Sequence, residues 1–167
     1  RQTVYVQGIT ESGNRLLYVI NGILSYVHLI SGKLPLRAEP CDLANLLNIC
    51  AVSQQHKAAA KGQAISVHVE PQDLAITSDE SALAGILKRL LDNAVKFTPE
   101  GGQIGLAAHV GAAPATVDVT VWDTGIGIAQ GQIEHILKPF AQADGSLARP
   151  YDGLGMGLAY VHEMVNR

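Results

Sequence analysis

The apolar residues of this 167-residue chain recur at two spacings, one typical of helices and one typical of strands. The first helical stretch runs from about Ile9 to Leu34, and Gly32 and Pro35 mark its end. A short extended piece is expected over 34–39. The apolar stripe of the first stretch consists of Leu16, Leu17, Ile20, Ile23, Leu24 and Val27. The chain is therefore predicted to begin with one long helix.

Two further helices are predicted in the middle of the chain. Asp42 is a candidate N-cap for the first of them, and Gly62 stops it. Ser78 or Asp79 caps the second, which reaches about Val95. The first of these helices carries an apolar stripe made of Leu43, Leu46, Leu47 and Cys50.

Three strands are predicted between and after these helices. Residues 65–70 alternate apolar with polar side chains, as do residues 117–122, which is the pattern of a half-buried strand. A third strand is expected at about 103–110, after a pair of glycines. The order is helix, strand, helix, strand, strand. This order favours an α+β fold, a two-layer sandwich with helices on one face of a mixed sheet, preceded by the long helix.

Composition narrows the function only slightly. The chain is 47% hydrophobic and 16% charged, so it can bury a core, and its net charge of −3 gives no reason to expect a nucleic-acid partner. No stretch approaches the roughly 18–20 apolar residues of a membrane span. Cys41 and Cys50 are expected to be free core thiols of a reducing compartment, which predicts a cytoplasmic domain. The six histidines lack metal-ligand spacing.

The helix that precedes residue 98 carries polar groups along one edge of its apolar face. Asn93 lies at the rim of that face, with Arg89 four residues before it and Lys96 three residues after it. An amide and two cations on one edge could bind an anion together with its metal ion. The alternative is a solvated helix flank with one asparagine.

A second candidate site is the Asp123-Thr124-Gly125-Ile126-Gly127 segment, which directly follows a predicted strand. Glycines at such a point allow the backbone to approach a ligand closely, and a carboxylate at a strand end could accept a hydrogen bond from an exocyclic amine. The alternative is an ordinary turn after a strand.

A third candidate is a run of alternating glycines before the last predicted helix, which continues through Val165. Gly153, Gly155 and Gly157, with Leu158 after them, could present backbone N–H groups to a phosphate at the helix N-terminus. The preceding segment, 141–152, is polar and is predicted to be a mobile lid, with Arg149 near its end and Phe140 at its base. The alternative for this segment is an ordinary surface loop.

Together these segments resemble the conserved boxes of sensor histidine kinases. Residues 90–98 resemble the N box, 123–128 the first glycine box, 138–140 the phenylalanine box, and 153–158 the second glycine box, all in the family's order. Residues 16–33 resemble the second helix of the dimerisation and phosphotransfer domain. The resemblance implies two parts, residues 1–35 from that domain and residues 36–167 from the ATP-binding catalytic domain.

The resemblance also implies a Bergerat-type fold that binds ATP and Mg²⁺. Asp123 would accept the adenine amino group, Asn93 would ligate Mg²⁺, and Lys96 would neutralise phosphate charge, with Arg89 and Arg149 as further cations. The remaining nucleotide-binding residues would be Gly125, Gly127, Phe140, Gly153, Gly155, Gly157 and Leu158.

The resemblance implies transfer of the γ-phosphoryl group of ATP to a histidine on an upstream helix. We expect the chain to be a fragment that lacks this helix and the last strands of the family's sheet, and His28 lies where the family is not phosphorylated. The implied partners are that upstream helix, a second copy of the parent protein and a response regulator. Two alternatives are an ATP-driven conformational switch and a pseudokinase module without phosphotransfer.

Overall fold

The structure is a computed structural model that describes residues 2–32, 34–141 and 155–167. These residues form two compact units, each with its own internal contacts. The first unit comprises residues 1–35 and 134–167, and the second comprises residues 36–133.

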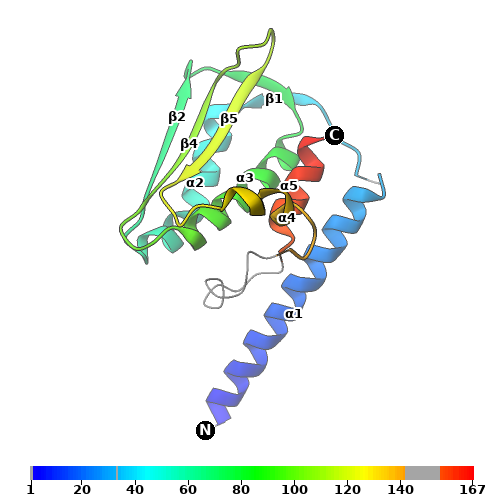
Figure 1. The fold of residues 1–167 in the computed structure, drawn as a ribbon, viewed down its shortest axis with the longest axis vertical. Helices are drawn as coiled ribbons and strands as arrows, with labels where there is room; N and C mark the ends of the chain where they lie inside the picture. The colour runs from blue at the N-terminus through cyan, green and yellow to red at the C-terminus, as the bar shows by residue number, and fades with distance from the viewer. Residues whose placement is uncertain (1, 33, 142–154) are drawn as a thin grey trace. The chain divides into compact units, whose positions relative to one another are not determined.

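The second unit is built on a three-stranded mixed sheet in the order β2-β4-β5. Strand β2 (Ala64–Glu70) pairs in parallel with β4 (Gln103–Val110), and β4 pairs antiparallel with β5 (Val117–Asp123). Helices α2 (Leu43–Ala59) and α3 (Glu80–Phe97) cover one face of this sheet (Figure 1). The α+β sandwich with helices on one face, predicted from the order of elements, is confirmed.

The core of this unit lies between the sheet and the two helices, because alternate strand residues point toward them. On the central strand, Ile104, Leu106 and Ala108 are fully buried. Apolar residues of the neighbouring strands are half-buried and pack against the same core, namely Ile65, Val67, Val69, Val117, Val119 and Val121. From the helices come Leu43, Leu46, Leu47, Cys50, Leu87 and Leu91.

Both helices begin where the sequence predicts, at an aspartate N-cap. The carboxylate of Asp42 accepts a hydrogen bond from the backbone N–H of Asn45 at 3.0 Å. Asp79 accepts one from the backbone N–H of Ala82 at 2.8 Å, which decides between it and Ser78. Each cap satisfies one of the N–H groups that the first turn of a helix leaves unpaired.

A separate antiparallel pair joins β1 (Glu39–Asp42) and β3 (Ala75–Ser78). The predicted extended piece at 34–39 is therefore placed too early, and β3 is not predicted at all. Both strands have only four residues, and β1 contains Pro40, so neither shows an alternation long enough to identify.

The first unit contains α1 (Gln2–Ile30) and α5 (Gly157–Val165), while the single turn α4 (Ile133–Ile136) begins at its boundary. Helix α1 starts earlier than the apolar stripe indicates and ends before Gly32, whose φ is +71°. The Arg167 guanidinium donates to the backbone oxygen of Leu29 at 2.6 Å, so the residues after α5 contact the end of α1.

Several predictions from composition can be compared with the described residues. Cys41 and Cys50 are free and buried, as expected, and burial raises the pKa of the Cys50 thiol. No group of three or more His, Cys, Asp or Glu side chains that could hold a metal ion occurs in the described part of the chain. Among the helices described here, none is long and apolar enough to cross a membrane.

Candidate functional site

The last two turns of α3 carry the first group of candidate residues. Asn93 is half-buried, and its side chain makes no hydrogen bond to any residue that the structure describes. The Lys96 ammonium lies 4.6 Å from the centre of the Phe97 ring. Arg89 donates from Nη1 to the backbone oxygen of Gly85 at 3.0 Å, so part of its guanidinium is used within its own helix. Asn93 therefore offers an amide that is oriented by the helix and is not engaged by any residue in the described ranges.

The loop after β5 carries the second group. Asp123 is exposed at the end of the strand, and its Oδ1 accepts a hydrogen bond from the backbone N–H of Gly125 at 2.8 Å. This bond fixes the rotamer of the carboxylate, because it ties one oxygen to the loop that follows. Gly127 has a φ of +67°, a conformation that favours glycine. The loop thus presents a fixed carboxylate beside a backbone segment that a ligand could approach closely.

The end of α3 and this loop are joined directly. The backbone N–H of Ile126 donates to the backbone oxygen of Phe97 at 3.3 Å. A Cβ on Gly125 would lie 2.5 Å from Asp123 Oδ1 and 2.7 Å from the Phe97 oxygen, so only glycine fits there. The structure therefore brings the α3 group and the Asp123 loop together, although 26 residues separate Phe97 from Asp123 in the sequence.

Two apolar side chains beside Gly127 are exposed, and they are not among the candidate site residues predicted from the sequence. Ile126 and Ile128 have relative exposures of 59% and 56%. They flank the glycine in a loop that otherwise exposes polar groups. In the sequence these two isoleucines alternate with glycine, a pattern that also occurs in buried turns. Their exposure in the structure is therefore what identifies them as surface residues.

The third group lies in the first unit. Gly155 has a φ of +68°, and a Cβ there would collide with the backbone of Phe140 and Ala141. Phe140 itself has a φ of +64° and a side chain that is 60% exposed. The phenylalanine box and the second glycine box are therefore adjacent. Arg149, Gly153 and residues 142–152 of the predicted lid at 141–152 lie outside the described residues, so the structure does not place them.

The start of α5 differs from that of the two capped helices. Gly157 is its first residue, and the preceding Met156 makes no side-chain cap hydrogen bond. Leu158 is half-buried on the first turn. The first N–H groups of this nine-residue helix are thus left without a side-chain acceptor from the cap position, and the helix dipole adds partial positive charge at that end.

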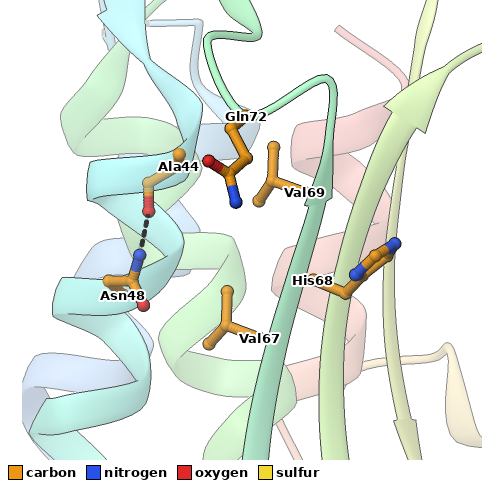
Figure 2. A pocket seen from close by; sticks show the side chains of 6 residues that line it. All are labelled: Ala44, Asn48, Val67, His68, Val69 and Gln72. Atoms are coloured by element: carbon orange, nitrogen blue, oxygen red, sulfur yellow. Dashed lines mark hydrogen bonds between the residues drawn. The ribbon is translucent and has the colours of Figure 1, made fainter.

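A groove between α2 and β2 is a different feature, and none of these residues lines it (Figure 2). Val67 and Val69 point toward α2, whereas His68 lies on the other side of the strand. The Asn48 amide donates to the backbone oxygen of Ala44 at 2.8 Å. The six residues that line the groove include no carboxylate and no lysine or arginine.

The chain matches the sequence profile of the family described as "Histidine kinase-, DNA gyrase B-, and HSP90-like ATPase" over residues 78–167, which is more than half of its length. It is 35% identical over 161 residues to an uncharacterized sensor-like histidine kinase of Rhizobium meliloti (strain 1021). That alignment covers 96% of this chain and 30% of the relative, so the chain spans about a third of this protein.

Solved structures give the same result. The full-length structure of ShkA in complex with AMPPNP superposes with a TM-score of 0.85 and 34% identity, covering 99% of this chain and 34% of that one. The histidine kinase ThkA in complex with the response regulator protein TrrA superposes with a TM-score of 0.68 and 25% identity, covering 89% of this chain and 43% of that one. The similarity extends over both the described sites and the long first helix.

Proposed function

Because the chain belongs to the histidine kinase-, DNA gyrase B- and HSP90-like ATPase family and carries an ATP-binding kinase domain like that of sensor histidine kinases, we propose that it is the kinase core of a two-component sensor. In this proposal it binds ATP with Mg²⁺ and supplies the γ-phosphoryl group to a histidine on a helix outside the chain. The observation that carries the proposal is the junction between α3 and the Asp123 loop.

At the adenine end, Asp123 is the proposed acceptor for the exocyclic amino group of the base. Its Oδ1 is held by the Gly125 N–H, which leaves Oδ2 available among the described residues. A carboxylate accepts from an amino group more strongly than a neutral acceptor does. Gly125 and Gly127 would let the backbone approach the base, while the exposed Ile126 and Ile128 would offer apolar surface to the ring.

At the phosphate end, Asn93 is the proposed Mg²⁺ ligand and Lys96 the proposed phosphate partner. The donor set fits this ion, because an amide oxygen is a hard ligand and Mg²⁺ commonly takes few protein ligands besides substrate phosphates. Asn93 is also free of hydrogen bonds to the described residues. When bound, Mg²⁺ would neutralise charge on the phosphates. Arg89 is a further proposed cation, within the limit that its Nη1 already contacts Gly85.

The first unit would supply backbone groups for the phosphates. Gly155 and Gly157 precede or begin α5, whose first N–H groups have no side-chain cap, and oxyanions bind well at such a helix start. Gly153 and Leu158 are proposed for the same role from the family's pattern, and Arg149 is proposed as a further cation for the phosphates. Phe140 is proposed as a further nucleotide-binding residue from the same pattern.

The proposed reaction forms a phosphorus–nitrogen bond to the acceptor histidine and breaks the bond between the γ-phosphorus and its bridging oxygen, releasing ADP. In such transfers the protein acts mainly by positioning the reactants and stabilising charge. The acceptor helix would pack against α1, whose exposed side chains include Leu16, Leu17, Ile20, Leu24 and Val27. The same stripe would join two copies of the parent, as in four-helix bundles, and a response regulator would receive the phosphoryl group.

The test is phosphorylation with radiolabelled ATP and Mg²⁺, read as acid-labile phosphate. The chain alone should bind ATP but form no phosphohistidine, while addition of a parent segment that carries the acceptor helix should restore labelling. Replacing the acceptor histidine should remove the label again. Labelling at the exposed His28 of the chain alone would contradict the proposal, and absence of ATP binding would contradict its premise.

A further inference from the structure

Lys61 and Gln63, in the turn that joins α2 to β2, hydrogen-bond to the C-terminal end of α3. The Lys61 ammonium donates to the backbone oxygens of Val95 at 2.7 Å and Lys96 at 3.1 Å. The Gln63 amide donates to those of Thr98 at 2.6 Å and Val95 at 3.1 Å. Gln63 is 5% exposed, so its bonds are made in the interior.

These bonds occupy the carbonyls that the end of a helix leaves unpaired. An α-helix has no internal donors for its last carbonyl groups, and a cation near them also interacts favourably with the helix dipole. The oxygens of Val95, Lys96 and Thr98 are taken by the turn, and that of Phe97 accepts from Ile126 in the Asp123 loop. Some of the last carbonyl groups of α3 thus accept hydrogen bonds from the turn that carries Lys61 and Gln63, and another accepts one from the Asp123 loop.

The turn that carries the cap is itself fixed. Gly62 has a φ of +61°, and the backbone N–H groups of Lys61 and Gln63 both donate to the Ala58 oxygen, at 2.9 and 3.0 Å. The backbone oxygen of Lys61 accepts from Gly101 at 3.0 Å. The two side chains therefore project from a rigid turn, and they transmit its position to the α3 end.

We infer that Lys61 and Gln63 are positioning residues that set the end of α3 against the Asp123 loop, so that Asn93 and Lys96 meet the phosphate end of a nucleotide whose base is held by Asp123. The inference rests on the proposed function. Asn93 precedes Phe97 by about one helical turn, so a shift of the α3 end moves it directly. A misplacement of about 1 Å can cost about 100-fold in a site that depends on alignment.

The test measures how much Mg²⁺ tightens ATP binding, as the ratio of the Kd in EDTA to the Kd in Mg²⁺, at a temperature well below each variant's Tm. Lys61→Met and Gln63→Leu remove the donors with little change of volume. Each should reduce the Mg²⁺ enhancement about tenfold, because the metal ligand on α3 no longer lines up with the bound base. Lys61→Arg keeps the charge and donors and should retain the enhancement. Lys61→Gln, which keeps one donor, replaces Lys61→Met if that variant does not fold.

Lys57→Met is the matched control. Lys57 also reaches from α2 to α3, where its ammonium lies 2.7 Å from Asp92 Oδ1, but the pair is exposed and bonds a side chain, not the helix end. It should leave the enhancement unchanged. An unchanged ratio in both Lys61→Met and Gln63→Leu, or equal losses of affinity in Mg²⁺ and in EDTA, would overturn the inference. Failure of the unmodified chain to bind ATP would instead overturn the proposed function.

Discussion

The starts of α3 and α5 show two opposite uses of the same structural feature. At α3 the protein itself satisfies one of the first N–H groups, since Asp79 Oδ1 accepts from the backbone of Ala82, while Oδ2 accepts from the backbone of Arg37 outside the helix. At α5 the cap position is Met156, which provides no side-chain acceptor, and glycines precede it. A capped start fixes a helix within its fold, whereas an uncapped start leaves donors for an anion.

The same contrast extends to the proposed site. The groups proposed in the second unit are side chains, those of Asn93, Lys96 and Asp123. The groups proposed in the first unit are backbone N–H groups beside glycines such as Gly155. Substitutions in the two parts should therefore fail in different ways. Loss of a side chain should remove one contact from an intact fold, while a methyl group on a glycine should displace the backbone itself.

The largest effect is expected at Asp123, where the contact is a single charged acceptor. Asp123→Asn replaces the acceptor with a donor toward the adenine amino group. ATP affinity should fall by at least about 100-fold, about 2.7 kcal/mol, as for the loss of a charged hydrogen bond. Calorimetric titration with ATP measures this, and the Tm should stay unchanged because Asp123 is exposed. Undiminished ATP affinity in this variant would exclude Asp123 as the adenine contact.

Asn93 tests the other side-chain contact with a smaller expected effect. Asn93→Ala should weaken ATP about tenfold, about 1.4 kcal/mol, in the presence of Mg²⁺ and little in EDTA, because the proposed contact is to the metal. The comparison of the two titrations is the measurement. Equal losses in both conditions would show that Asn93 does not ligate Mg²⁺.

The residues of this proposed side-chain part stand in motifs that can be recognised in the sequence, whereas some contacts that hold the fold around them cannot. The glycine and asparagine motifs mark their own positions, and the 3.6-residue periodicity locates α3 and its cap. By contrast, the cap on the far end of α3 comes from Lys61 and Gln63, more than 30 residues earlier. No local pattern signals it, because its partners are backbone carbonyls and any residue supplies those. Strands β1 and β3 are missed for a similar reason, since four residues without a clear alternation obtain their stability from pairing with each other.

Gly155→Ala tests the backbone part of the site. A residue other than glycine at a φ of +68° costs about 1–2 kcal/mol, and the new methyl group would also collide with the backbone of Phe140 and Ala141. Gly32→Ala is the control, because Gly32 has a φ of +71° but its Cβ would meet only Arg167 Nη2 at 3.8 Å. Both variants should lose stability in urea unfolding, Gly155→Ala more than Gly32→Ala because of the collision, and Gly155→Ala alone should bind ATP about threefold to tenfold more weakly. If Gly155→Ala and Gly32→Ala bound ATP with equal affinity, Gly155 would not be a nucleotide-binding residue.

The smallest effect concerns the capped start of α3 and should appear only in acid. Hydrogen bonds from the backbone of Arg37, and then of Ala82, hold the pKa of Asp79 below its ordinary value of 3.8. A carboxyl group whose folded-state pKa is lowered contributes stability that is complete above its unfolded pKa. That contribution is lost as the pH falls through the folded-state pKa, because protonation then costs the folded state more than the unfolded state.

Asp79→Asn keeps a capping oxygen but cannot titrate, so its stability should fall less between pH 5 and pH 3 than that of the unmodified chain. Asp79→Ala lacks both the cap and the titration and should be less stable than Asp79→Asn at pH 7. Urea unfolding at several pH values measures all three chains, and ATP affinity at pH 7 should be equal in them, since this helix start is used by the fold and not by the ligand. A parallel loss of stability in Asp79→Asn and the unmodified chain would show that the cap does not titrate in this range. A loss of ATP affinity in either variant would show that the start of α3 is not independent of the site at its end.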